Sequence, residues 1–246
     1  MGFDGQGALI TGGKRIGAAI AIALAQRGIQ VALSFNRSKA EADGVAATIQ
    51  AAGGRAFVYQ ADLSRGEEAQ RLVNQAATAM GRLDVLINMA SVYSSVTFED
   101  TDERIWDSVI DVDLKASFLC ARAAVPHMKT QGGGRIINFT DWVARSGRPR
   151  YKGFLPYYVA KHAVVGLTEA LALELADDRI LVNAVAPGPI VAPPDTTDED
   201  YRAVEAATPL GRWGGEAEIV SAVLFLLDTT FMTGETIRID GGRHLK

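Results

Sequence analysis

Residues 8–27 read ALITGGKRIGAAIAIALAQR, and this stretch decides the fold. Ala8–Ile10 is a short apolar run typical of a buried strand, and Ile16–Arg27 carries apolar residues at helical spacing. The glycine turn Thr11–Gly17 lies at their junction. Such a turn lets backbone N–H groups approach a pyrophosphate at the positive end of the helix. The stretch therefore predicts a phosphate-binding strand–turn–helix unit; a tight turn without a ligand is the alternative.

The same alternation of apolar runs and helical segments continues along the chain. Further strands are predicted at Gln30–Phe35, Ala56–Tyr59, Val85–Asn88, Arg135–Phe139, Leu181–Ala184 and Thr236–Ile239, and further helices at Lys39–Ala52, Gly66–Met80, Glu103–Met128, Tyr157–Ala176 and Glu216–Leu227. Most strands are continuously apolar, which is typical of strands covered on both faces. The pattern predicts an α/β fold: a single doubly wound Rossmann-type domain over residues 1–246, with a seven-stranded parallel sheet and helices on both faces.

One segment does not follow the alternation of strands and helices. Pro187–Pro209 contains five prolines and an acidic cluster from Asp195 to Asp200. A connection of this length is more often functional than a simple link between elements. We therefore predict a substrate lid around residues 188–212; a solvated surface loop is the alternative.

Composition excludes several classes of function. The chain has 246 residues with a net charge of −4, so it offers no basic surface for nucleic acid or for anionic membranes. One cysteine, Cys120, excludes an internal disulfide, and the three histidines have no metal-ligand spacing, so no metal is predicted. No signal peptide and no apolar run of about 18 residues is visible. The expectation is a cytoplasmic protein that acts on a small molecule.

The end of the second strand predicts the choice of nucleotide. NAD-binding folds place an acidic residue there, about 20 residues after the turn, on the ribose 2′-hydroxyl. Here the chain reads Asn36-Arg37-Ser38, with no acid until Glu41. Arg37 would instead neutralise a 2′-phosphate, with Arg15 facing it from the first turn and Ser38 donating a hydroxyl. NADP(H) is therefore favoured; two solvated surface arginines are the alternative.

Polar and small residues follow the next two strands. Asp62-Leu63 follows the third strand, and Asn88, Ala90 and Ser91 follow or close the fourth. The carboxyl ends of strands in an open parallel sheet line the ligand crevice. Asp62 can accept from the adenine amino group, and the small Ala90 allows close approach of the ribose. Together these positions indicate a cofactor.

Tyr157 and Lys161 are the candidate proton-transfer pair. They are four residues apart at the start of a predicted helix, so their side chains share one face. A nearby ammonium favours the phenolate, and we therefore expect Lys161 to lower the pKa of Tyr157 and to hold a ribose hydroxyl. The neighbouring Tyr158 has no lysine four residues later, so we expect no such effect on its pKa, and it serves as the control for Tyr157.

Taken together, these motifs resemble the short-chain dehydrogenase/reductase family over nearly the whole chain. The resemblance rests on Thr11–Gly17, Asp62, Asn88-x-Ala90, Tyr157-x-x-x-Lys161 and Pro187-Gly188, in the family's order. It implies hydride transfer from a nicotinamide, tyrosine as the proton donor, Pro187, Gly188 and Ile190 near the carboxamide, and a homotetramer. The predicted cofactor-binding residues are Gly12, Arg15, Ile16, Gly17, Asn36, Arg37, Ser38, Asp62, Leu63, Asn88, Ala90, Ser91, Tyr157, Lys161, Pro187, Gly188 and Ile190.

Several departures from the family pattern resemble one branch, the pteridine reductases and their bacterial relatives. That branch looks similar in its arginine-bearing first turn, in the segment 36–38 and in having an aspartate, here Asp141, in place of the catalytic serine. The resemblance implies that Asp141, Tyr157 and Lys161 are catalytic, and that Asp141 and Tyr157 pass a proton to a ring nitrogen. It also implies that Ser91 touches cofactor or substrate and that Tyr93 stacks on a flat heterocycle.

Two residues near this site have two interpretations each, and a third departs from the family pattern. Asp141 would be a structural cap if Thr140 supplies the family's hydroxyl. Trp142 would line a substrate pocket or pack in the core. Asp113 stands where the family has a helix asparagine that relays protons.

The sequence therefore predicts an NADPH-dependent reductase of a C=N or C=O bond, with a pterin-like ring as the favoured substrate. A ketone or 3-oxoacyl thioester reductase is the alternative enzyme. A non-catalytic NADP(H)-binding sensor is the alternative from another class, although the retained Tyr157 and Lys161 argue against it.

Overall fold

The computed structural model describes residues 3–12, 14–146 and 151–246, and within these ranges seven strands form one parallel sheet. The strands are β1 (Gly7–Thr11), β2 (Gln30–Phe35), β3 (Ala56–Gln60), β4 (Val85–Asn88), β5 (Gly134–Phe139), β6 (Ile180–Pro187) and β7 (Thr236–Ile239). Their order is β3-β2-β1-β4-β5-β6-β7, and every neighbouring pair is parallel. The predicted doubly wound, seven-stranded sheet is confirmed.

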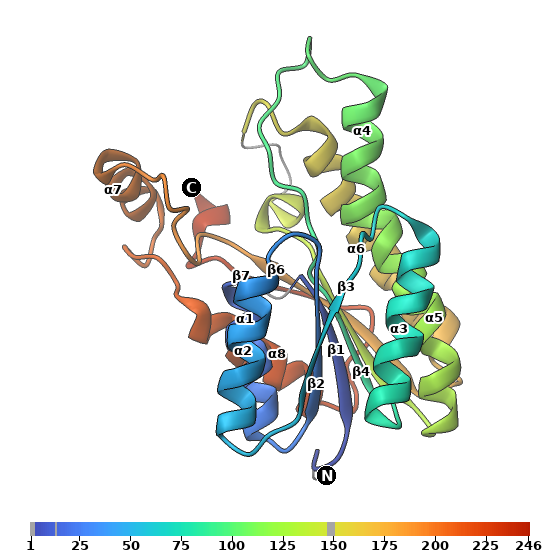
Figure 1. Cartoon of the computed structure of the whole chain (residues 1–246). Helices are drawn as coiled ribbons and strands as arrows, with labels where there is room; N and C mark the ends of the chain where they lie inside the picture. Colours follow the sequence, from blue (N-terminus) through green and yellow to red (C-terminus); the bar gives the residue numbers. More distant parts are fainter. Residues whose placement is uncertain (1–2, 13, 147–150) are drawn as a thin grey trace.

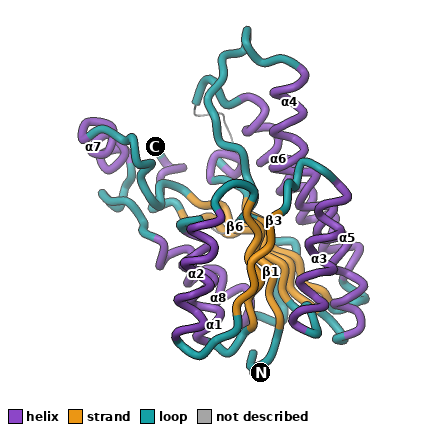
Figure 2. Tube along the Cα trace, in the orientation of Figure 1, coloured by secondary structure: helices purple, strands orange, loops and turns teal. Residues whose placement is uncertain are grey.

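Helices cover both faces of this sheet, as Figures 1 and 2 show. On one face lie α1 (Ile16–Gln26), α2 (Lys39–Ala51) and α8 (Glu216–Asp228), and on the other lie α3 (Gly66–Met80), α5 (Ala116–Thr130) and α6 (Leu155–Leu175). The helices α4 (Glu103–Ile110) and α7 (Asp198–Ala207) extend beyond the end of the sheet where the strands finish. No helix in the described part of the chain is long and apolar enough to span a bilayer.

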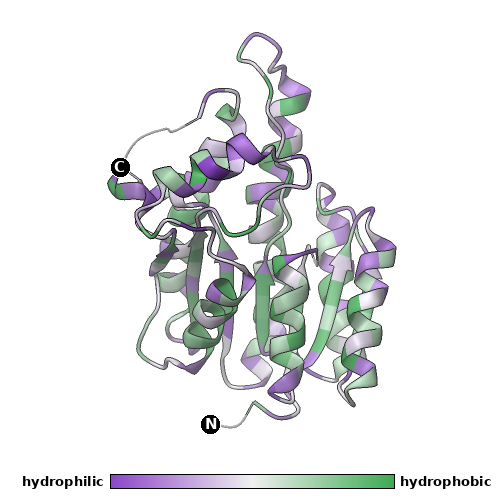
Figure 3. Ribbon diagram, turned by 90° about the vertical axis from the view of Figure 1, so that its left-hand side faces the viewer, coloured by the Kyte–Doolittle hydropathy of each residue, from purple (hydrophilic) through white to green (hydrophobic). Residues whose placement is uncertain are grey.

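The central strands supply residues to two separate cores. In β1, Ala8 and Ile10 join the core beneath α1 and α8, whereas Leu9 between them joins the core beneath α3 and α5. Because successive side chains of a strand point to opposite faces, a strand that is buried on both sides must be apolar at every position. Figure 3 shows the result: apolar residues run along the strands, and polar residues lie on the outer helix faces and loops.

Two helical segments differ from the sequence prediction. The predicted single helix Glu103–Met128 is divided, because a π-helical turn at Asp111–Lys115 separates α4 from α5. The predicted lid region contains α7, which the sequence analysis did not assign. Thr197 caps α7 by accepting a hydrogen bond from the Asp200 backbone N–H at 3.1 Å. Threonine followed by acidic residues is a usual helix start, so this signal was available.

Asp84 fixes the edge of the sheet where the strands begin. Its buried carboxylate accepts a hydrogen bond from the Gly7 N–H at 2.8 Å and pairs with Arg82 at 2.6 Å. Its backbone N–H donates to the Gly7 carbonyl, and its carbonyl accepts from the Arg135 N–H, both at 2.8 Å. Asp84 thus joins β1, β4 and β5 at the edge opposite to the one where the glycine turn lies.

Replacing Asp84 with alanine should destabilise the protein. The change leaves the Gly7 N–H without its partner inside the protein, which costs about 1–3 kcal/mol. The free energy of unfolding from urea denaturation measures the loss. Asp43→Ala is the control, because Asp43 pairs with Lys39 on the exposed surface of α2 and should contribute nothing measurable. Equal stability of the two variants would contradict this role for Asp84.

Candidate active site

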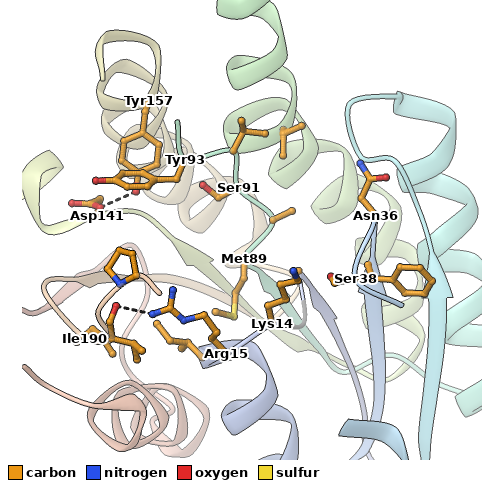
Figure 4. Close-up of a pocket in the computed structure, with 18 of the residues that line it drawn as sticks. Lys14, Arg15, Asn36, Ser38, Met89, Ser91, Tyr93, Asp141, Tyr157 and Ile190 are labelled. Atoms are coloured by element: carbon orange, nitrogen blue, oxygen red, sulfur yellow. Dashed lines mark hydrogen bonds between the residues drawn. The ribbon is translucent and has the colours of Figure 1, made fainter. Parts of the chain in front are cut away.

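A cleft of about 1150 Å³ opens where the strands end, and most of the predicted site residues line it. Figure 4 shows Tyr157, Tyr93 and Asp141 grouped at one end, Asn36 and Ser38 at the other, and Lys14, Arg15 and Met89 near the middle. The predicted residues that line the cleft are Gly12, Arg15, Ile16, Asn36, Arg37, Ser38, Asp62, Leu63, Ala90, Ser91, Tyr93, Asp141, Trp142, Tyr157, Gly188 and Ile190.

Four predicted cofactor residues lie behind the cleft wall: Gly17, Asn88, Lys161 and Pro187. Asn88 is buried, and its side-chain amide donates to Asn138 Oδ1 at 2.9 Å and to the Ser117 carbonyl at 3.3 Å. The Asn88 side chain therefore ties β4 to β5 and to α5. The position of Asn88 at a strand end was predicted correctly, but its side chain points into the protein.

The glycine turn brings the N-terminus of α1 to the cleft. A Cβ atom on Gly17 would lie 2.7 Å from the Gly12 carbonyl oxygen, and one on Gly12 would lie 3.1 Å from the Ala90 backbone. Glycine at both positions therefore permits the close approach of the turn, the helix and the segment after β4. Gly13 lies outside the described residues. The backbone that remains exposed at the helix start fits a pyrophosphate group.

The far end of the cleft carries charges and hydroxyls of the kind that bind an adenosine phosphate. Asn36, Arg37 and Ser38 line this end. Lys14 lines the cleft as well and forms an ion pair with Glu41 at 3.1 Å. Backbone hydrogen bonding lowers the pKa of Glu41, and the contact with Lys14 lowers it further. The sequence analysis gave Lys14 no role, although a lysine inside a phosphate-binding turn was a usable signal.

Arg15 makes contacts that differ from the predicted role, in which it faces the 2′-phosphate beside Arg37. Its guanidinium donates to the backbone carbonyls of Val191 and Ala192, each at 2.8 Å. The backbone of Arg15 has a φ of 48°, in the left-handed region, and this conformation aims the side chain towards the segment after β6. Arg15 therefore connects the glycine turn to the start of the predicted lid.

Tyr157 and Asp141 form a direct hydrogen-bonded pair. Tyr157 Oη donates to Asp141 Oδ2 at 2.8 Å, and the other oxygen of Asp141 accepts from the Val143 N–H at 3.0 Å. Burial raises the pKa of the Asp141 carboxyl above its ordinary value. Thr140, by contrast, is buried and donates to the Lys161 carbonyl at 2.6 Å. Of the two candidates for the serine position, Asp141 is therefore the one that faces the cleft and Tyr157.

Aromatic rings surround the Tyr157 hydroxyl. Tyr93 packs edge-on against Tyr157, with ring centroids 4.9 Å apart, and stacks on Phe154 at 4.7 Å. Burial, followed by the charge of Asp141, raises the pKa of Tyr93 to about 12. Trp142 is buried yet lines the cleft, and it packs edge-on against Tyr151 at 6.2 Å. This end of the cleft can hold a flat or apolar group.

Lys161 makes an ion pair that the sequence analysis did not predict. Its ammonium lies 3.1 Å from Asp113 Oδ1 and donates to the Phe139 carbonyl at 3.0 Å. The prediction that Lys161 lowers the pKa of Tyr157 is wrong for this structure. Burial raises the pKa of Tyr157 well above its ordinary value, and the charges of Asp141 and Asp113 raise it further. The lysine charge is matched by Asp113 and cannot act on the phenol alone.

The sequence of the chain matches known families over nearly its whole length. A family model described as Enoyl-(Acyl carrier protein) reductase matches residues 11–244. A 3-oxoacyl-[acyl-carrier-protein] reductase FabG from Staphylococcus epidermidis is 37% identical over 245 residues, covering 97% of this chain and 98% of that protein. A FabG reductase from Staphylococcus aureus is 38% identical with the same coverage. These names do not support the resemblance to pteridine reductases.

Solved structures agree with this match. A short-chain dehydrogenase/reductase from Serratia marcescens superposes with a TM-score of 0.91 at 32% identity, covering 99% of this chain and all of that one. An acetoin dehydrogenase from Enterobacter cloacae superposes with a TM-score of 0.88 at 36% identity, covering 98% and 96% of the two chains. Because nearly all of this chain is covered, the likeness extends over the sheet and both helical layers.

Removing the Arg15 side chain should loosen the segment after β6. Arg15→Ala deletes both hydrogen bonds to the Val191 and Ala192 carbonyls, so the amides of this segment should exchange with solvent several-fold faster. Hydrogen exchange read by mass spectrometry measures the change. Lys14→Ala is the matched control, because Lys14 precedes Arg15 in the same turn but bonds to Glu41 on α2 and not to the segment after β6. Unchanged exchange in Arg15→Ala would show that the connection does not hold the segment.

Proposed function

Because the chain belongs to the short-chain dehydrogenase/reductase family of oxidoreductases, we propose that it is an NADPH-dependent reductase of a carbonyl group, with a 3-oxoacyl thioester as the favoured substrate. The observation that carries the proposal is the buried Tyr157 hydroxyl, held by Asp141 inside a cleft that also contains the glycine turn. The homotetramer implied by the family resemblance stays a prediction.

The residues of the cleft suit a dinucleotide bound across the strand ends. The N-terminus of α1 would hold the pyrophosphate, Asp62 and the segment 36–38 would hold the adenosine half, and Gly188 and Ile190 would border the nicotinamide. A bound nicotinamide supplies the hydride. Everything else in the reduction, including the position of the substrate and the source of the proton, falls to the side chains of the protein.

Tyr157 is the proton donor in this proposal. The substrate oxygen takes the place next to Tyr157 Oη, and the phenol gives it a proton as negative charge develops. A phenol with a raised pKa stays protonated through neutral pH, so it is ready to donate. Asp141, whose pKa burial also raises, can carry the replacement proton and return it along the 2.8 Å hydrogen bond.

The names of the relatives support the substrate class. Both FabG proteins are described as 3-oxoacyl-[acyl-carrier-protein] reductases, and they align with nearly the whole chain. The acetoin dehydrogenase, which shares the fold at a TM-score of 0.88, is named for a ketone. A carbonyl beside an acyl chain therefore agrees with the relatives better than a pterin does.

A pterin-like C=N bond is the second candidate, because of Asp141. A serine hydroxyl orients a carbonyl oxygen. A carboxyl group that is hydrogen-bonded to Tyr157 can instead deliver a proton to a ring nitrogen. The ring of Tyr93, beside Tyr157 in the cleft, offers a surface for a flat heterocycle. This candidate keeps the same cofactor and the same proton donor.

We expect the purified protein to oxidise NADPH in the presence of acetoacetyl-CoA. Tyr157→Phe should lower kcat by about 10²–10⁴-fold, the usual contribution of a positioned acid, and leave the Kd for NADPH within a factor of about two. The fall in NADPH absorbance measures the rate, and quenching of protein fluorescence measures binding.

Tyr158→Phe is the matched control, because Tyr158 is the next residue of α6 and its carbonyl accepts from the His162 ring. It should keep full activity. Turnover of dihydropterins but not of acetoacetyl-CoA or simple ketones would favour the second candidate. Full activity in Tyr157→Phe, on any of these substrates, would refute the mechanism.

NADPH should bind more tightly than NADH. Arg37 and Lys14 place positive charge at the adenosine end of the cleft, so a 2′-phosphate gains hydrogen bonds there that a hydroxyl does not. Arg37→Ala should raise the Kd for NADPH about tenfold or more and change the Kd for NADH little. Isothermal titration calorimetry gives both constants.

Arg104→Ala is the control for this measurement, since Arg104 is an exposed arginine on α4 outside the cleft. It should leave both dissociation constants unchanged. A wild-type protein that binds NADH as tightly as NADPH would remove the argument for NADP(H).

A further inference from the structure

A buried carboxylate, that of Asp113, lies beside Lys161 and behind the segment after β4 that lines the cleft. Asp113 is 1% exposed and Lys161 is 3% exposed, and 3.1 Å separates Asp113 Oδ1 from the lysine Nζ. Asp113 belongs to the π-helical turn between α4 and α5, whereas Lys161 belongs to α6. A lone ion at such a depth is very costly, so each charge depends on the other.

The same carboxylate also holds the segment after β4. Ser91 Oγ donates a hydrogen bond to Asp113 Oδ1, and the Val92 backbone N–H donates to Asp113 Oδ2 at 2.7 Å. Asp113 therefore receives two neutral donors and one ammonium. An asparagine at this position, as the family resemblance implies, could accept from the Val92 N–H through its oxygen and donate to Ser91 Oγ through its amide, but it would carry no charge to match Lys161.

The partners of Lys161 leave it little freedom. Its ammonium has three N–H groups, of which one faces Asp113 and one donates to the Phe139 carbonyl at 3.0 Å. Its Nζ lies 5.5 Å from the centre of the Tyr157 ring. Burial favours the protonated phenol, whereas a bare ammonium at this distance would favour the phenolate, so the partner of Lys161 affects how readily Tyr157 loses its proton.

We propose that Asp113 is a positioning residue that matches the charge of Lys161, ties it to the segment after β4, and thereby keeps the Tyr157 phenol protonated. The charged and titratable groups that face Tyr157 are Lys161 on the same helix, Asp113 from the π-helical turn, Asp141 after β5 and Tyr93 after β4. Lys161 is the one cation among these four groups. The carboxylate of Asp113 balances the charge of Lys161.

This proposal does not require a particular substrate. Its consequence for direction does rest on the proposed function: a phenol that stays protonated donates to a substrate in reduction, whereas oxidation of an alcohol requires the phenolate to accept. The pairing of Asp113 with Lys161 therefore favours the form of Tyr157 that donates a proton in reduction.

The test is a titration of Tyr157 in the whole protein, read by the ultraviolet absorbance of tyrosinate. The chain has six tyrosines, so the same titration of Tyr157→Phe in each background is subtracted to isolate Tyr157. In Asp113→Asn the side chain keeps its size and Lys161 loses its counter-charge. The ionisation of Tyr157 should then move to lower pH by about one unit or more relative to wild type.

Asp84→Asn is the matched control, because Asp84 is a buried carboxylate in an ion pair, with Arg82, at the opposite edge of the sheet. It should leave the Tyr157 titration where it is in wild type. The double variant Asp113→Asn with Lys161→Met removes both charges and leaves no unmatched ion, so it guards against a failure of the single variant to fold. There the Tyr157 titration should return to near the wild-type position.

Two results would overturn the proposal. One is an unchanged Tyr157 titration in folded Asp113→Asn. The other is a downward shift that persists in the double variant, since the cause would then not be the lysine charge. Loss of acetoacetyl-CoA reduction in every protein, with the predicted titrations intact, would refute the proposed substrate and leave the role of Asp113 standing.

Discussion

A parallel sheet covered on both faces is the constraint on which the site depends. Because all strands run in one direction, the segments that leave them emerge at the same edge, and this edge brings together Gly12, Asp62, Ser91 and Asp141 from four different strands. This arrangement restricts the sequences of the strands, which must be apolar at successive positions because each strand supplies residues to two cores. At the opposite edge, the buried carboxylate of Asp84 binds the Gly7 N–H and has a structural role away from the cleft.

Within the site, the buried carboxylate of Asp113 and the partly buried carboxylate of Asp141 have different surroundings and hence different tasks. Asp113 receives three donors, one of which is the Lys161 ammonium, so its negative charge is matched. Asp141 receives two neutral donors, and burial raises its pKa, so it takes up a proton more readily. The same chemical group therefore serves as a partner for an ammonium at position 113 and as a hydrogen-bond partner of the phenol at position 141.

The sequence predicted the parts of the site that depend on backbone periodicity. Tyr157 and Lys161 share a helix face because they are four residues apart, and the strand ends are visible as boundaries of apolar runs. It did not predict the direction of Arg15, whose backbone has a φ of 48° in a short turn and whose guanidinium bonds to the carbonyls after β6. It also did not predict that Asp113 and Lys161 pair, because the contact joins separate helical segments and depends on a π-helical turn. Where the backbone is irregular, the direction of a side chain depends on the tertiary structure, and the local sequence pattern does not predict it.

Position 141 is where overall similarity and local chemistry lead to different substrates. The Val143 N–H binds the aspartate as a local cap, and this contact involves one carboxylate oxygen while the other remains for Tyr157. A carbonyl oxygen gains negative charge as hydride arrives, so a phenol alone can protonate it, and Asp141 then serves to resupply the phenol. A ring nitrogen that must be protonated to accept hydride at its neighbouring carbon needs an acid before or during that transfer. The two candidate functions share the hydride step, and the basicity of the atom that receives the proton separates them.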